Sequence, residues 1–113
     1  MQIRIKITAN DIRIALDRQS KGFTMESPVT VFLERSGYKG AVHSPNRSHK
    51  GLWCYDPTGA TYLQIRHTKR LHKMLTVWWK SQVCIPNTYI VQAAQVLEEP
   101  HFPGHSQEGT DAK

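Results

Sequence analysis

Three isoleucines alternate with polar residues at the start of the chain. Ile3, Ile5 and Ile7 are separated by Arg4 and Lys6, and a period of two is typical of a strand that buries one face. The pattern therefore predicts that the chain opens with a strand whose isoleucines lie in the core.

Two capping signals follow this strand. Thr8 is expected to cap a first helix that runs to about Asp17, because Thr is favoured at the residue before a helix. Ser27 followed by Pro28 predicts a second helix from Pro28 to Arg35, since proline suits the first helical position.

The middle of the chain favours strands. Residues 38–43 can form one, and residues 52–55 and 60–67 form a hairpin around the turn 56–59, because aromatic and β-branched residues stand on both sides of a Pro/Gly turn. Residues 83–91 are expected to return as an edge strand, since proline cannot donate to a sheet ladder and Pro86 interrupts the segment.

The clearest amphipathic helix is predicted over residues 69–80, capped by Thr68. Its apolar side recurs at helical spacing and consists of Leu71, Met74, Leu75 and Trp78. The order of elements predicts an α+β fold, with a small antiparallel sheet of four to five strands and two to three helices on one face. Residues 1–97 form a single domain in this interpretation, and residues 98–113 form a flexible acidic tail.

No apolar run approaches the roughly 18 residues that a membrane span needs, so we expect no membrane association. Cys54 and Cys84 are too few for a disulfide framework and form no Cys-x-x-Cys pair. Reduced thiols fit a cytoplasmic protein, which is the expected compartment.

Positive charge is concentrated in the middle of the chain. Residues 35–97 contain nine lysines and arginines against one carboxylate, Asp56. Such a field attracts phosphate or other anions, although a solvated surface is the plainer alternative. The expected contacts are Arg47, Lys50, Arg66, Lys69, Arg70 and Lys73.

Aromatic residues accompany this charge and could stack on bases. Trp78 falls on the apolar stripe of the predicted helix and is expected in the core, whereas Trp79 points about 100° away. Trp79 is therefore a candidate for stacking or for an interface, and a homo-oligomer is an open expectation for so small a domain.

Four histidines in the basic segment could act as general acid and base: His43, His49, His67 and His72. Neutral surface histidines are the competing interpretation, because no spacing singles out a pair. A zinc site from Cys54, Cys84 and two histidines lacks the usual close ligand pairs. We expect no catalytic residue, no metal and no cofactor.

Residues 27–33, Ser-Pro-Val-Thr-Val-Phe-Leu, resemble the Cys-Pro-Ile/Val-Ala-x-Ala-Leu segment of small uncharacterised proteins common in bacteriophages and their hosts. Residues 7–12 are similar to the end of that family's opening strand and the Thr-x-x-Asp-Ile segment that follows it. Residues 79–89 are similar to its closing segment, in which a helix ends in an aromatic residue and Val-x-Pro-Phe-x-Phe follows. Ser27 stands at the family's cysteine. The resemblance implies a phage or mobile-element setting and no particular activity.

These observations favour a non-catalytic phage-type accessory protein that binds an anionic partner through a basic surface. The partner could be a nucleotide signal, which the protein would sequester, or a host defence complex that handles nucleic acid. A general DNA- or RNA-binding module and a small metal-independent nuclease remain open alternatives.

Overall fold

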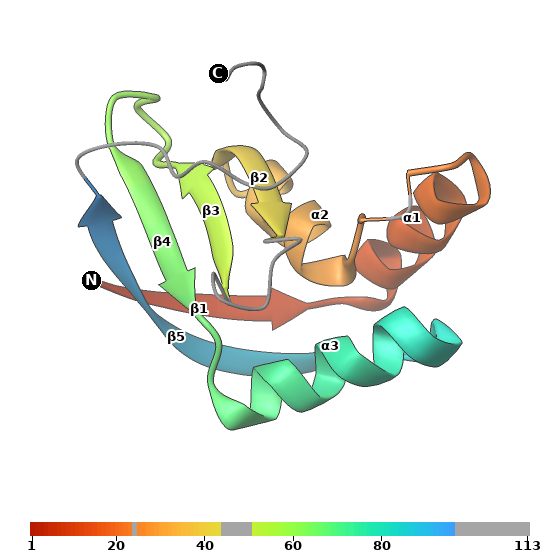
Figure 1. Ribbon diagram of the computed structural model, residues 1–113. Coiled ribbons are helices and arrows are strands. Elements are labelled where there is room, and N and C mark those ends of the chain that lie inside the picture. The colour runs from red at the N-terminus through yellow and green to blue at the C-terminus, as the bar shows by residue number, and fades with distance from the viewer. Residues whose placement is uncertain (24, 44–50, 97–113) are drawn as a thin grey trace, which may run out of the picture.

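A computed structural model describes residues 1–23, 25–43 and 51–96 of the chain. The elements (Figure 1) are, in order, β1 (Gln2–Ile7), α1 (Ala9–Ser20), α2 (Pro28–Arg35), β2 (Lys39–His43), β3 (Leu52–Tyr55), β4 (Tyr62–Arg66), α3 (Lys69–Ser81) and β5 (Asn87–Val96). The predicted tail, residues 98–113, lies outside the described residues. None of the helices in the described part of the chain is both long and apolar enough to cross a membrane.

The five strands form one antiparallel sheet in the order β1-β5-β4-β3-β2. Together with the three helices, this sheet confirms the predicted α+β fold. The prediction of a closing edge strand is wrong, because β5 lies between β1 and β4. Pro86 precedes the first residue of β5, Asn87, so it removes no hydrogen bond from the ladder.

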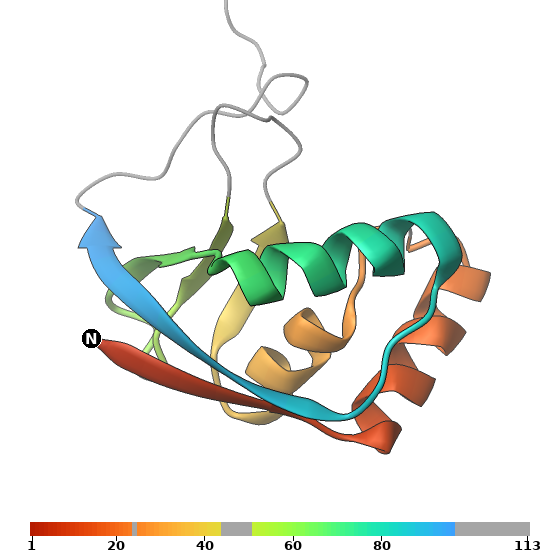
Figure 2. The ribbon, with the colours of Figure 1, turned by 90° about the horizontal axis from the view of Figure 1, so that it is seen from below.

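The core lies on the helix-bearing side of the sheet. The alternating isoleucines of β1 are all buried, which confirms the predicted strand and its inward face. Six of the eight residues of α2 are buried, because this helix packs against both β1 and β2 within the curl of the sheet (Figure 2).

Side-chain caps start the helices as predicted. The Ser27 side chain accepts two backbone N–H groups of the turn that follows, and the Thr8 and Thr68 side chains each accept one. The end predicted for α1 is wrong, because the helix continues beyond Asp17 to Ser20. The polar residues 18–20 continue the helix, because ion pairs of Arg18 with residues outside α1 stabilise its last turn.

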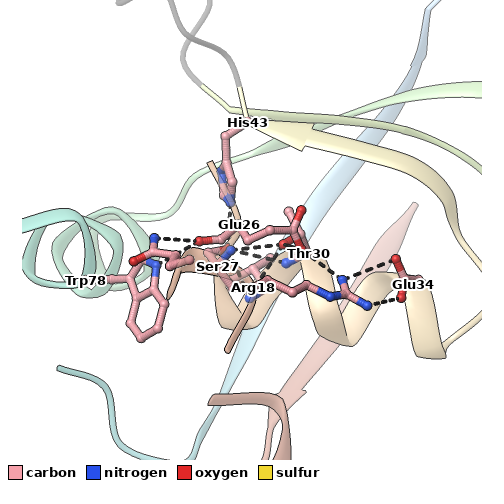
Figure 3. A network of polar contacts seen from close by, with 9 residues as sticks. Arg18, Glu26, Ser27, Thr30, Glu34, His43 and Trp78 are labelled. Carbon is pink, nitrogen blue, oxygen red and sulfur yellow. Dashed lines mark hydrogen bonds and ion pairs between the residues drawn. The ribbon is translucent and has the colours of Figure 1, made fainter. Parts of the chain in front are cut away.

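Those ion pairs belong to Arg18, near the end of α1. Its guanidinium lies 2.8 Å from a Glu26 carboxylate oxygen and 2.6 Å from one of Glu34, as Figure 3 shows. The indole Nε1 of Trp78 donates to the Glu26 carbonyl oxygen at 3.0 Å, so this segment connects α1, α2 and α3.

A second ion pair joins α1 to the end of α2. The buried Asp11 carboxylate accepts from the Arg35 guanidinium at 2.6 and 2.9 Å and from the Thr8 backbone N–H at 2.9 Å. Burial disfavours the charged carboxylate, but these hydrogen bonds outweigh it and hold the pKa of Asp11 below its usual value. The same guanidinium also donates to the Lys6 carbonyl oxygen on the outer edge of β1.

The backbone at position 51, directly before β3, requires glycine. Its φ is +133°, and a Cβ atom there would lie 2.7 Å from the Ile65 carbonyl oxygen of β4. We expect Gly51→Ala to lower the free energy of unfolding by about 2–3 kcal/mol, because both the strained φ and the clash must be relieved. Urea denaturation measures the change.

Gly22→Ala is the matched control, since Gly22 also has a positive φ, +97°, but a Cβ atom there would meet nothing within 4 Å. It should cost only about 1 kcal/mol. Equal losses for the two variants would show that the close approach of Gly51 to β4 does not matter.

Candidate anion-binding surface and groove

Three of the predicted cations lie together on α3. The helix buries Leu71 and Leu75 against the core, and helical spacing turns Lys69, Arg70 and Lys73 to the exposed side of its first two turns. The predicted cluster is therefore partly brought together by one amphipathic helix.

The other predicted cations lie elsewhere. Arg66 ends β4 and is exposed on the sheet face opposite the core, because its neighbour Ile65 points inward. It therefore lies on the sheet face that points away from the helices. Arg47 and Lys50 lie outside the described residues.

No carboxylate of the described residues pairs with these cations. Asp11, Asp17, Glu26 and Glu34 form their ion pairs with Arg18, Lys21 and Arg35, on and near α1 and α2. Asp56 accepts from Thr58, Gly59 and Thr61 within its own turn. The positive charge of α3 is therefore left uncompensated by the part of the chain that the structure describes.

A groove runs beside this helix. It has a volume of about 600 Å³ and lies between α3 and the segment that leads into β5. Arg70 also covers the ring of Tyr89, with its guanidinium carbon 5.2 Å from the ring centre. The remaining lining residues are Lys73, Met74, Val77, Val83, Cys84, Ile85 and Asn87.

Three of the candidate histidines form a row on the other flank of α3. The ring centres of His43 and His67 are 6.2 Å apart, and those of His67 and His72 are 6.1 Å apart. His72 is exposed on α3, whereas His43 is only 4% exposed at the end of β2. His49 lies outside the described residues.

The inner two histidines of the row are held neutral. Burial, and secondarily the neighbouring His67, lowers the pKa of His43 to about 3. Burial and then His72 lower the pKa of His67 to about 4. Both ring nitrogens of His67 are buried and find no hydrogen-bond partner among the described residues, so nothing there favours the charged form.

His43 instead has a structural partner. Its Nε2 lies 2.7 Å from the Ser27 hydroxyl oxygen (Figure 3). That oxygen already accepts the Val29 and Thr30 N–H groups, so its own proton is free to donate to the neutral imidazole. The contact joins the start of α2 to β2. Because Ser27 and His43 are both buried, a substrate cannot reach it.

The predicted core position of Trp78 is confirmed, since this side chain is completely buried. Trp79 is 39% exposed and packs edge-on against His43, with ring centres 5.0 Å apart. Trp53 and Tyr62 stack at 5.9 Å on the sheet face away from the helices. The stacking or interface role of Trp79 stays a prediction.

The two cysteines lie in different surroundings. Cys54 is buried in β3, and burial raises the pKa of its thiol to about 11. Cys84 lines the groove, and burial raises its pKa as well. Among the described residues no group of three His, Cys, Asp or Glu side chains is arranged to hold a metal ion.

Sequence reasoning missed both the groove and the contact between Ser27 and His43. The sequence signal for the groove is the apolar run of Val83, Cys84 and Ile85 shortly after the predicted helix, and the structure leaves Val83 and Ile85 exposed. Comparisons of the chain with models of protein families, with curated proteins and with solved structures give no match.

Proposed function

We propose that this chain is a non-catalytic binding protein whose α3 surface engages an anionic partner. The observation that carries the proposal is the exposure of Lys69, Arg70 and Lys73 on one helix with no carboxylate of the described residues in an ion pair with them. Unpaired cations close together attract phosphates or an acidic protein surface.

The position of His43 argues against a catalytic role for that histidine in the nuclease alternative. A general acid or base must reach the reacting atoms, and His43 is buried against Ser27. In this proposal the contact between Ser27 and His43 therefore supports the fold. In the phage setting that the sequence resemblance implies, the protein would sequester a nucleotide signal or bind to a host defence complex and block it.

The triple variant Lys69→Ala/Arg70→Ala/Lys73→Ala tests the surface. We expect it to weaken binding to a short labelled single-stranded RNA or DNA at least tenfold at low salt. It should also reduce the slope of log affinity against log salt by about 0.7 for each lost phosphate contact. Fluorescence anisotropy over a salt series measures both quantities.

Arg13→Ala/Lys21→Ala is the control, because it removes two exposed positive charges from α1 and its C-cap, a part of the chain that the proposal does not use. It should leave most of the affinity intact. An equal loss of binding free energy for each charge removed, three in the first variant and two in the control, would mean that net charge, and not the α3 surface, governs binding. Cleavage of the probe that a single histidine substitution abolishes would contradict the non-catalytic role.

A further inference from the structure

The groove beside α3 reaches the first residues of β5, Asn87 and Tyr89, and one edge of this part of β5 pairs with no strand of the described residues. In the pairing of β1 with β5, Met1 and Ala93 exchange both of their backbone hydrogen bonds. Antiparallel partners alternate between bonded and non-bonded pairs, so the odd-numbered residues of β5 point their backbone groups at β1. Thr88 and Ile90 point theirs at the opposite side.

No strand of the described residues covers that side. β4 ends at Arg66, which is opposite Gln92, and the chain then turns into α3. The Thr88 N–H is taken by the Asn87 side chain, but the Ile90 N–H, the Ile90 carbonyl and the Thr88 carbonyl have no partner among the described residues. Figures 1 and 2 both show α3 running along this part of β5.

The two ends of the groove differ in chemistry. Arg70 and Lys73 stand near Tyr89, at the end where α3 begins. At the other end, Val77, Val83 and Ile85 present exposed aliphatic side chains, and Ile85 is 69% exposed. A ligand that satisfies both ends must carry negative charge at one end and apolar groups at the other.

We propose that the partner is a protein that docks an extended acidic segment here, adding it as a strand to the edge of β5. Main-chain hydrogen bonds to Ile90 and Thr88 would supply affinity, and alternate side chains would meet the groove. Carboxylates face Arg70 and Lys73, while aliphatic side chains cover Val77 and Ile85. This inference rests on the proposed function, since it uses two of the same cations.

A nucleotide fits the groove less well. The one aromatic ring in its lining, Tyr89, is 5% exposed and lies beneath Arg70, so no ring of the described lining is open for a base to stack on. Unpaired backbone groups and exposed aliphatic side chains suit a peptide strand instead.

The geometry also sets the spacing in the segment. From Arg70 to Val77 the helix rises about 10 Å, which corresponds to about three residues of an extended chain. Side chains on one face of a strand are two or four residues apart. The segment should therefore carry a carboxylate and a Val, Ile or Leu about two to four residues apart.

Selection from a library of random peptides displayed on phage tests this inference on the full-length protein. We expect enrichment of sequences with a carboxylate and an aliphatic residue at that spacing. A synthetic peptide of the enriched sequence should slow hydrogen exchange of the Ile90 amide, measured by NMR on the labelled protein. Ile85→Ser should weaken this peptide at least tenfold.

Phe23→Ser is the matched control, because Phe23 is a similarly exposed apolar side chain, at 61%, that does not line the groove. It should not change peptide affinity. Failure to enrich such peptides, or enriched peptides that leave exchange at Ile90 unchanged, would overturn the inference. Neither result would affect RNA binding by the α3 cations, and Ile85→Ser should leave RNA affinity intact, so the two proposals fail separately.

Discussion

Replacing Trp78 by alanine is expected to lower the free energy of unfolding by about 4 kcal/mol, as is usual for a large aromatic side chain removed from a core. Trp78 is completely buried and packs with Ala15 and Val31, so its loss leaves a cavity where α1, α2 and α3 meet. Its indole N–H also satisfies the Glu26 carbonyl. Urea denaturation followed by circular dichroism measures the change.

Two variants separate the causes of this loss. Trp78→Phe keeps most of the packing but removes the hydrogen bond, and it should cost about 1–2 kcal/mol. Trp79→Ala truncates the same residue type one position further on, where the side chain is 39% exposed, and should cost less than half as much as Trp78→Ala. A larger loss at Trp79 would mean that its contact with His43 contributes more stability than the burial of Trp78.

Mild acid should destabilise the protein well above the pH at which carboxylates titrate. The pKa values of His43 and His67 lie near 3 and near 4 in the folded chain, against about 6.5 when unfolded. As the pH falls below 6.5, the unfolded chain binds protons that the folded chain does not, so stability decreases. Between pH 7.5 and pH 5 the loss is about 2 kcal/mol for the fully buried His43 and smaller for the partly exposed His67. Denaturation curves over a pH series measure it.

Substitutions assign this loss to its residues. His67→Phe replaces a ring whose nitrogens have no partner among the described residues, and it should remove the smaller part of the decrease, because His43 is the more deeply buried of the two. His72→Gln changes an exposed member of the same row and should leave most of the decrease intact, because burial contributes more than His72 to the lowered pKa of His67. A wild-type protein with constant stability from pH 7.5 to pH 5 would refute the assignment. Asp11 acts in a different window, because its lowered pKa makes its contribution fade only below about pH 4.

The histidines that cause the acid response and the residues of the binding surface lie on opposite flanks of α3. Lys73 and Val77 line the groove, while His72 belongs to the histidine row and Trp79 packs against His43 of that row. Stability measurements at the row and binding measurements at the groove can therefore be made with different variants. The expectation is that His67→Phe leaves affinity for RNA unchanged at neutral pH, which makes it a useful folded control.

Local signals predicted the elements well. Alternating isoleucines gave β1, and the Thr8, Ser27 and Thr68 caps placed the three helix starts, because strand period and capping depend on residues within one or two turns of each other. The buried stripe of α3, including Trp78, followed from helical spacing in the same way. The charge of α3 was also evident from composition.

Long-range pairing was not encoded in those local patterns. The sequence by itself determined which segments become helix or strand, and which of their faces are apolar. Only the tertiary structure decided that β5 lies inside the sheet, with Val91 opposite Ile3, and that β4 stops at Arg66, so that a groove lies between α3 and the start of β5. Strand order depends on the packing of residues nearly ninety positions apart, and no short-range preference specifies it.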